Sequence, residues 1–425
     1  MSRWSEFPKE LCEAVLSKSS LKGILRFKAV CPSWGAAVDE CTKSSSFTCL
    51  PETSWLVLPQ DLNKDEAIDG SRFYSLEGSF YSSNISMPEE SRDAICFGSS
   101  HGWLVLLNNQ LDFMISSPLL SGIQLPLPPL NTFPDILGIT YHKGTAYAYN
   151  IVDDHFTVKW KTAEEIKKHL EYIEETKETF ETWDITCVKD LRSKMRAKGV
   201  LSSRPTCSNK DKIGVMVMYI FGDENNCRYN SLAFCTTSDH KWTKLEERRW
   251  YVEIMGYDNE FYVLKENYGV DVWDFSTFSI PIKKMEIKIV ASAIPRGVNT
   301  RFPKVYMIKE GAGLMLVVDF QTHAQIRFGI YKLDNVVCPL GTSPAWMEVQ
   351  SIGSNALVLG SNNSIVMSSH DSLRCDEDSI YYAYKRNWMS PSYNLGVFSL
   401  RDKSAGKKKV CKLPMDFEPL AYSGS

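Results

Sequence analysis

Two short motifs contain nucleophilic side chains at spacings that could support catalysis. Residues 98–102, GSSHG, fit the G-x-S-x-G pattern of hydrolases, with Ser100 in the position of the nucleophile. This chemistry requires a strand before the serine and a helix after it, so that the hydroxyl lies exposed at a sharp turn. The residues that follow, WLVLLNN, instead indicate a second strand that continues into a hairpin. The glycines therefore predict a tight turn between two strands, and no catalytic residue is predicted.

The second motif pairs a thiol with an imidazole, because Cys235 and His240 lie five residues apart in CTTSDH. The segment indicates a hairpin turn, with no third group to orient the imidazole, so we expect a buried Cys235. Residues 375–379, CDEDS, lack the alternating oxygen ligands and central glycine of a calcium loop. No histidine pairs with a cysteine at zinc-ligand spacing. The sequence therefore predicts no metal site and no cofactor, and a hydrolase with Ser100 as the nucleophile stays an alternative that only the GSSHG pentapeptide supports.

The composition of the chain is that of an ordinary soluble globular protein, with 44% hydrophobic and 23% charged residues. The net charge of -3 provides no basic field for nucleic acid or an anionic membrane, so neither is an expected partner. The first residues lack the features of a secretory signal, and the 12 cysteines are irregularly spaced. We therefore expect reduced thiols and residence in the nucleus and/or cytoplasm. Residues 407–409, KKK, are a weak nuclear signal, and a solvated loop is the favoured interpretation.

Residues 4–40 contain apolar residues at helical spacing and predict three short helices. Pro8 suits the first position of one helix, and Pro32 suits the first position of another that carries Trp34. Three helices this short cannot bury much of their own apolar surface. The unit is therefore expected to pack against a partner or a neighbouring domain.

From about residue 50 the chain consists of short β-rich runs separated by turns rich in Asn, Asp, Gly and Ser. Segments such as LLNNQL and YDNEFY predict hairpins, because asparagine tolerates the positive φ that tight turns need. Repeated hairpins over this length favour a closed, radially repeated sheet, since closure removes exposed edges. The fold is therefore predicted to be mainly β with a small all-α N-terminal unit, the β part being a propeller of about seven blades.

One segment interrupts the β pattern. Residues 163–183, AEEIKKHLEYIEETKETFETW, carry Ile166, Leu170 and Ile173 at i, i+4 and i+7, which predicts an amphipathic helix inserted between strands, in an insert of about 163–190. A solvated helix on the propeller is favoured over a dedicated partner-docking helix.

The first helical unit, WSEFPKELCEAVLSKSSLKGILRFKAVCPSWGAAV, resembles an F-box. It has an aromatic-Pro start, an apolar helix, a Leu-Arg-Phe segment and then Val-Cys-x-x-Trp. The rest of the chain resembles the plant F-box proteins of the KIB type. That second resemblance is carried by CFGSSHGWLVLLN, IQLPLPPL, VLSSRPT, LAFCTTSDHKWTKLE, WMEVQSIGSNALVLGSNNS, DSIYYAY and NLGVFSL. Together these matches imply an F-box over residues 3–44 and a substrate-capturing propeller over residues 50–420.

The resemblance implies the substrate-recognition subunit of an SCF-type (Skp-cullin-F-box) ubiquitin ligase. The F-box would bind a Skp-family adaptor, and through it cullin and RING subunits, while the propeller would recruit a protein for ubiquitination and proteasomal degradation. Catalysis would then reside in the partners. The residues that the resemblance assigns to the adaptor are Phe7, Pro8, Leu11, Val15, Leu16, Leu25, Val30, Cys31 and Trp34. Some of these must form the internal core of the unit, and the sequence alone does not divide the two roles; no substrate-binding residue is identified.

Two residues depart from the F-box pattern. Gly23 stands where an acidic or polar residue is frequent, and Gly35 stands where a basic residue is common. Because glycine inside a helix costs about 1 kcal/mol, both are expected to loosen the unit. They motivate an alternative function, a propeller scaffold or regulatory binding protein with a weakened F-box.

Overall fold

The protein was analysed as a computed structural model of the full chain. It describes residues 9–17, 19, 21–42, 55–58, 72–75, 79–82, 94–101, 103–108, 110–116, 124–136, 138–142, 145–149, 163–176, 185–187, 195–205, 209, 212–221, 230–276, 280–289, 291–292, 294, 304–311, 313–320, 326–338, 341–360, 364–368, 375–385, 393–406 and 420–422.

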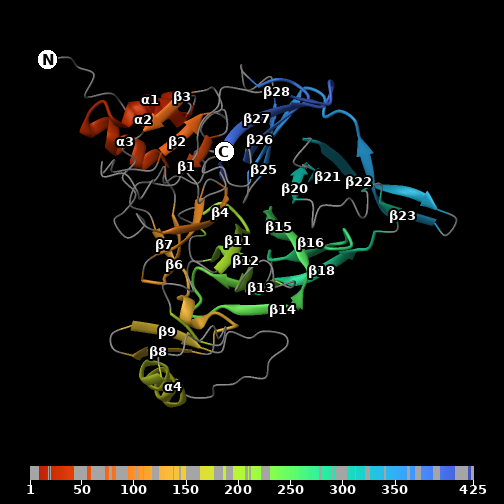
Figure 1. The fold of residues 1–425 in the computed structure, drawn as a ribbon. Coiled ribbons are helices and arrows are strands. Elements are labelled where there is room, and N and C mark those ends of the chain that lie inside the picture. The colour runs from red at the N-terminus through yellow and green to blue at the C-terminus, as the bar shows by residue number, and fades with distance from the viewer. Residues whose placement is uncertain are drawn as a thin grey trace.

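The chain begins with three helices, which lie together at one side of the molecule (Figure 1). They are α1 (Lys9–Ser17), α2 (Leu21–Lys28) and α3 (Pro32–Thr42). The third starts at Pro32, where the missing N–H of proline leaves no hydrogen bond unmade. Both α1 and α2 contact α3.

Most of the remaining chain forms five blades, each a sheet of four or five strands that are consecutive in the sequence (Figure 1). The first contains β4 (Ile95–Ser100), β5 (Trp103–Leu107), β6 (Phe113–Ser116) and β7 (Gln124–Pro126). The second contains β11 (Met195–Leu201), β12 (Gly214–Phe221), β13 (Asn230–Thr236) and β14 (Thr243–Arg249). The third contains β15 (Tyr251–Tyr257), β16 (Glu260–Lys265), β17 (Val270–Asp274) and β18 (Ile282–Ile287).

The last two blades have five strands each. The fourth contains β20 (Lys304–Glu310), β21 (Gly313–Asp319), β22 (Phe328–Cys338) and β23 (Gly341–Val349), with β19 (Ala291–Ser292) added in parallel to the outer edge of β23. The fifth contains β24 (Asn355–Leu359), β25 (Ser364–Ser368), β26 (Ser379–Lys385), β27 (Tyr393–Ser399) and β28 (Ser404–Gly406). The strand order of this blade is β25-β24-β26-β27-β28. β25, which is its second strand in the sequence, therefore lies at the inner edge of the blade.

Two further sheets differ from the blades. In one, β29 (Leu420–Tyr422) pairs with β1 (Trp55–Leu58), which continues to β2 (Arg72–Ser75) and β3 (Ser79–Ser82). The two ends of the β region are thereby joined in one sheet. The other contains β8 (Gly138–His142), β9 (Thr145–Tyr149) and β10 (Ile185–Cys187), and lies at the periphery with α4 (Ala163–Thr176) (Figure 1). The chain is therefore a β-propeller, but the expected number of about seven blades is wrong: the part of the chain that the structure describes forms five.

The peripheral sheet explains part of that difference. The inner strand β4 of the first blade contacts β11 of the second directly, so the sheet of β8–β10 between them in the sequence is an appendage. The amphipathic helix predicted over residues 163–183 is present as α4, and it contacts β8 of the appendage. Residues 177–183 lie outside the described residues.

The core of the propeller lies between neighbouring blades, which pack through the alternating inward side chains of their strands. Between the first and second blades, the rings of Phe113 and Trp242 meet edge to face at 5.1 Å, and the indole N–H of Trp242 donates to Pro128 O at 2.8 Å. Between the third and fourth blades, Trp346 is fully buried and donates to Tyr268 O at 2.9 Å. Trp242 and Trp346 thus each have a polar partner as well as apolar neighbours.

The inner strands approach one another closely at two glycines. A Cβ at Gly98 on β4 would lie 1.9 Å from the carbonyl oxygen of Gly199 on β11. A Cβ at Gly256 on β15 would lie 2.0 Å from the carbonyl oxygen of Leu201, also on β11. No side chain fits at either contact, so glycine sets the spacing between the first three blades.

Candidate functional site

The three N-terminal helices enclose a small apolar core of their own. Its members are side chains from all three helices: Cys12, Leu16, Ile24, Phe27, Val38 and Cys41. Trp34 covers this core by stacking on Phe27, with ring centroids 4.1 Å apart and an angle of 19° between the planes. Among the side chains that the structure describes, the unit therefore has a buried interior and an exposed outer surface.

Local hydrogen bonds cap the end of α1 and the start of α3. At the end of α1, the backbone N–H of Ser19 donates to Leu16 O and its hydroxyl donates to Val15 O. At the start of α3, the N–H of Gly35 donates to Cys31 O at 2.9 Å, which makes Cys31 the residue that caps the helix. These bonds fix the short connections and hence the relative positions of the helices.

Three large apolar side chains of this unit remain exposed to solvent: Leu11 (50%), Val15 (42%) and Val30 (58%). Leu11 and Val15 are four residues apart on α1 and so share one face of that helix. Val30 follows the end of α2, next to the exposed Pro32. Because the unit already has a core, these exposed side chains form a candidate surface for binding another protein.

The predicted adaptor-binding residues separate into groups. Leu16 is fully buried and belongs to the internal core of the unit, one of the two roles that the sequence alone does not divide. Trp34 and Cys31 are partly buried, and Trp34 also stacks on the core. Leu25 lies in α2, and its side chain is outside the described residues, as are Phe7 and Pro8 altogether. Leu11, Val15 and Val30 are the predicted residues that the structure leaves exposed.

Gly35 has a packing role that the sequence did not reveal. A Cβ at this position would lie 3.3 Å from the carbonyl oxygen of Lys28, at the end of α2. The absence of a side chain lets α3 approach α2, whereas the sequence predicts a looser unit at this position. The same two helices are linked by an ion pair between Lys28 and Asp39 at 2.6 Å, which contributes less than about 1 kcal/mol because both side chains are partly exposed.

The thiol of Cys31 is the most reactive one expected in this surface. The hydroxyl of Ser33 lies 3.1 Å from the sulfur, and hydrogen bonds from this hydroxyl and from the backbone N–H of Trp34 lower the pKa of Cys31. In the propeller, burial raises the pKa of Cys96 to about 12 and that of Cys235 well above its usual value.

We therefore expect iodoacetamide to alkylate Cys31 several-fold faster than Cys96 or Cys235 at pH 7.5, because the thiolate is the reacting species and a lower pKa increases its fraction. The midpoint of the rate against pH should lie below that of an ordinary thiol and rise in Ser33→Ala. Peptide mass spectrometry after timed labelling measures both. Faster labelling of Cys235 than of Cys31 would contradict the expectation.

The two motifs that could have supported catalysis lie in strands and turns of the propeller. Ser100 ends β4 and pairs with Trp103 at the start of β5, so the predicted strand, tight turn and strand are present, but Gly98 lies within β4 and takes no part in the turn. His101 occupies this turn with φ of 51°, and burial followed by the charge of Arg204 lowers its pKa. Cys235 is buried within β13, as expected, while His240 is exposed. Within the described residues, no group of three or more His, Cys, Asp or Glu side chains could hold a metal ion.

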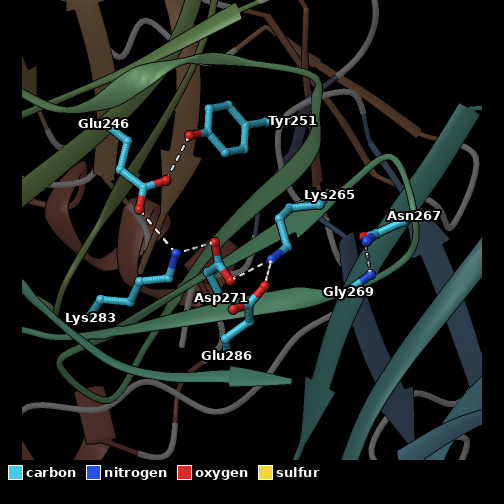
Figure 2. Close-up of polar contacts among 8 residues, drawn as sticks. All are labelled: Glu246, Tyr251, Lys265, Asn267, Gly269, Asp271, Lys283 and Glu286. Atoms are coloured by element: carbon cyan, nitrogen blue, oxygen red, sulfur yellow. Dashed lines mark hydrogen bonds and ion pairs between the residues drawn. The ribbon is translucent and has the colours of Figure 1, made fainter. Parts of the chain in front are cut away.

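A cluster of ion pairs joins the second and third blades (Figure 2). Asp271, which is 1% exposed, accepts from Lys265 at 2.9 Å and lies 2.8 Å from Lys283. Lys283 continues to Glu246 of β14 at 3.0 Å, and the hydroxyl of Tyr251 donates to the same carboxylate at 3.0 Å. Burial lowers the pKa of Lys283, but its hydrogen bonds to the two carboxylates outweigh this and raise it overall. Each of these charged side chains thus has an oppositely charged partner, and the ion pair between Lys283 and Glu246 links the third blade to β14.

The fold and this geometry define a β-propeller protein with a helical N-terminal unit. The model of the KIB1-4 beta-propeller family matches residues 73–399, and the chain belongs to this family. The sequence resemblance to KIB-type proteins is therefore confirmed. No helix among the described residues is long and apolar enough to cross a membrane.

Two curated relatives come from Arabidopsis thaliana. The F-box protein KIB2 is 21% identical over 82% of this chain and 66% of its own length. The F-box only protein 6 is 26% identical over 35% of this chain and 32% of its own length. The chain thus spans less than two thirds of either relative. An exo-β-1,3-galactanase structure from Clostridium thermocellum matches 70% of this chain and 62% of its own with 10% identity, and its TM-score of 0.25 is too low to support a conclusion.

Proposed function

We propose that this protein is the substrate receptor of an SCF-type ubiquitin ligase. In this proposal residues 3–44 are an F-box that binds a Skp-family adaptor, and residues 50–420 are the domain that captures a target protein. The adaptor would connect the chain to cullin and RING subunits, which with an E2 would ubiquitinate the target and direct it to the proteasome. The chain itself would not catalyse the transfer. We propose residence in the nucleus and/or cytoplasm.

The observation that carries the proposal is the pattern of exposure in the helical unit. A unit of three short helices that encloses an apolar core of its own still presents Leu11, Val15 and Val30 to solvent. Apolar side chains on short helices are suited to insertion into a groove of a partner protein. Both curated relatives are named F-box proteins, which supports the same class of partner.

The proposal is tested by binding of the purified full chain to a purified Skp-family adaptor. We expect a stable complex, and we expect Leu11→Asp and Val15→Asp each to weaken it about 30-fold or more, since a buried anchor at an interface is worth about 2 kcal/mol. Tyr172→Asp is a matched control, because Tyr172 is 49% exposed but lies on α4. Isothermal titration calorimetry gives the affinities.

Failure of the intact chain to bind any Skp-family adaptor would refute the proposal. Equal affinities for wild type and the two α1 variants would instead remove these residues from the interface. The alternative, a propeller scaffold with a weakened F-box, predicts no co-purification of cullin with the chain. Gly35 no longer favours that alternative, because its position permits the close packing of α2 and α3.

A further inference from the structure

The junction between the fifth and the first blade differs from the others in its connection along the chain. Neighbouring blades elsewhere follow each other in the sequence, as where β14 ends at Arg249 and β15 begins at Tyr251. The first and fifth blades stand at the two ends of the series, because β4 begins at Ile95 and β28 ends at Gly406. Contacts between distant parts of the chain must therefore close this junction, at a cost in conformational entropy.

The short strand β29 lies at this junction. It follows the fifth blade in the sequence and lies against β4, the inner strand of the first blade. It also pairs with β1 in an antiparallel register that places Ala421, its middle residue, opposite Leu56. The strand thus links the end of the β region both to its first sheet and to its first blade.

The sheet that contains β29 also leads into the helical unit. Residues 43–54 connect the end of α3 at Thr42 to the start of β1 at Trp55. In this sheet β1 lies between β29 and β2, and β3 follows β2 at the edge. Pairing between β29 and β1 therefore ties the segment that carries the three helices to the propeller.

This pairing is short compared with those inside the blades. β29 contributes three residues to its ladder with β1, whereas β11 pairs with β12 through seven residues. The inner strands of the first three blades also meet so closely that a Cβ at Gly98 or Gly256 would overlap a backbone carbonyl oxygen of β11. Elements held by few hydrogen bonds open at a lower free energy than the core to which they are joined. The ladder of β29 and β1 is thus suited to separate while the blades remain folded.

We infer that β29 is a latch that fixes the position of the helical unit relative to the propeller. Its separation from β1 leaves the five blades folded and frees the sheet of β1–β3, with the helices attached to it, to move. The helices keep their own apolar core in both states. In a ligase receptor the latch would set the distance between the adaptor on the helices and the target on the propeller. That consequence rests on the proposed function; the latch itself does not.

The inference is tested by a proline in the middle of β29. Ala421→Pro interrupts the ladder with β1, because proline fixes φ and has no backbone N–H. Ala405→Pro is the matched control, since Ala405 is likewise the middle residue of a three-residue antiparallel strand, β28, which pairs with β27. A chain that ends at residue 419 is the second test variant, because it lacks β29 altogether.

Distances between the helices and the propeller report the state of the latch. Spin labels attached to non-natural residues at Ala36 of α3 and Met347 of β23, which are both exposed, avoid the 12 native cysteines. Double electron–electron resonance should give a narrow distance distribution for wild type and Ala405→Pro. The distribution should be at least twice as wide for Ala421→Pro and for the chain that ends at residue 419. Equal widths in all four proteins, or equal broadening by both prolines, would overturn the inference.

Hydrogen exchange of the unmodified chain shows whether the latch opens on its own. Amides of β1 should exchange at least tenfold faster than those of β5, β12 and β16, which are likewise the second strands of their sheets. Exchange of β1 at the rate of these strands would show that β29 belongs to the cooperative core and would overturn the inference. Unfolding of all five blades in the chain that ends at residue 419 would overturn it for the same reason.

Adaptor binding separates the latch from the proposed ligase function. The apolar core of the helical unit consists of residues from α1, α2 and α3, so a Skp-family adaptor should bind wild type and Ala421→Pro with affinities within twofold. Failure of both proteins to bind would refute the ligase proposal alone, since the distance and exchange measurements decide the latch. Loss of adaptor binding confined to Ala421→Pro would show that β29 stabilises the helices themselves and would overturn the inference.

Discussion

Replacement of Gly98 by alanine is expected to lower the free energy of unfolding by more than about 3 kcal/mol, a large effect for one added methyl group. The new Cβ would lie 1.9 Å from the carbonyl oxygen and 2.9 Å from the carbonyl carbon of Gly199. These are backbone atoms of β11, which is paired with β12 along its whole length from Met195 to Leu201. Relief of the clash would therefore require the first and second blades to separate, with loss of the apolar contacts between them.

Gly313→Ala is the matched control, because Gly313 is also a strand glycine but its Cβ would lie 3.4 Å from the nearest atom, an ordinary contact. Its effect should stay below about 1 kcal/mol. Urea unfolding followed by tryptophan fluorescence measures both variants against wild type. Similar midpoints for Gly98→Ala and Gly313→Ala would show that the inner strands can separate without penalty.

Replacement of Asp271 by alanine is expected to have the second large effect and to lower the free energy of unfolding by about 3 kcal/mol. Asp271 is 1% exposed and contacts both Lys265 and Lys283. Its removal leaves the ammonium group of Lys265, whose side chain is only 11% exposed, without its buried partner. Breaking one side of a buried pair costs more than the pair itself contributes, because the remaining charge is still removed from water.

Glu286→Ala tests the same cluster at its surface. Glu286 also contacts Lys265, but its side chain is 40% exposed, so water can replace the lost carboxylate. We expect a loss below about 1 kcal/mol. Thermal unfolding of the two variants separates the buried from the solvated contribution, and equal losses would contradict the assignment of Asp271 as the centre of the cluster.

Local features were predictable from the sequence where a single residue type restricts the backbone. Pro32 starts α3, and the YDNEFY hairpin places Asp258 and Asn259 at positive φ of 49° and 59°. A tight turn between two strands was also predicted at GSSHG, although the residue at positive φ there is His101 and Gly98 lies within β4. Such features depend on neighbours within a few residues, which the sequence displays directly.

The number of blades was not predictable in this way. The sheet of β8–β10 has the same hairpin pattern as a blade, yet it lies outside the contact between β4 and β11. The pairing of β29 with β1 joins strands from opposite ends of the β region, and no local pattern signals a pairing at that separation. Division of the chain by an average blade length therefore overestimated the number.

The sequence by itself determined the kinds of elements in this protein and its family, because apolar spacing, turn residues and the KIB-type segments are all local properties of the chain. The tertiary structure alone decided which apolar side chains are buried in a core and which are exposed to solvent. Leu16 and Val15 are adjacent and chemically alike, but one is fully buried and the other is 42% exposed. Burial depends on what packs against a residue from distant parts of the chain, and that arrangement exists only once the chain has folded.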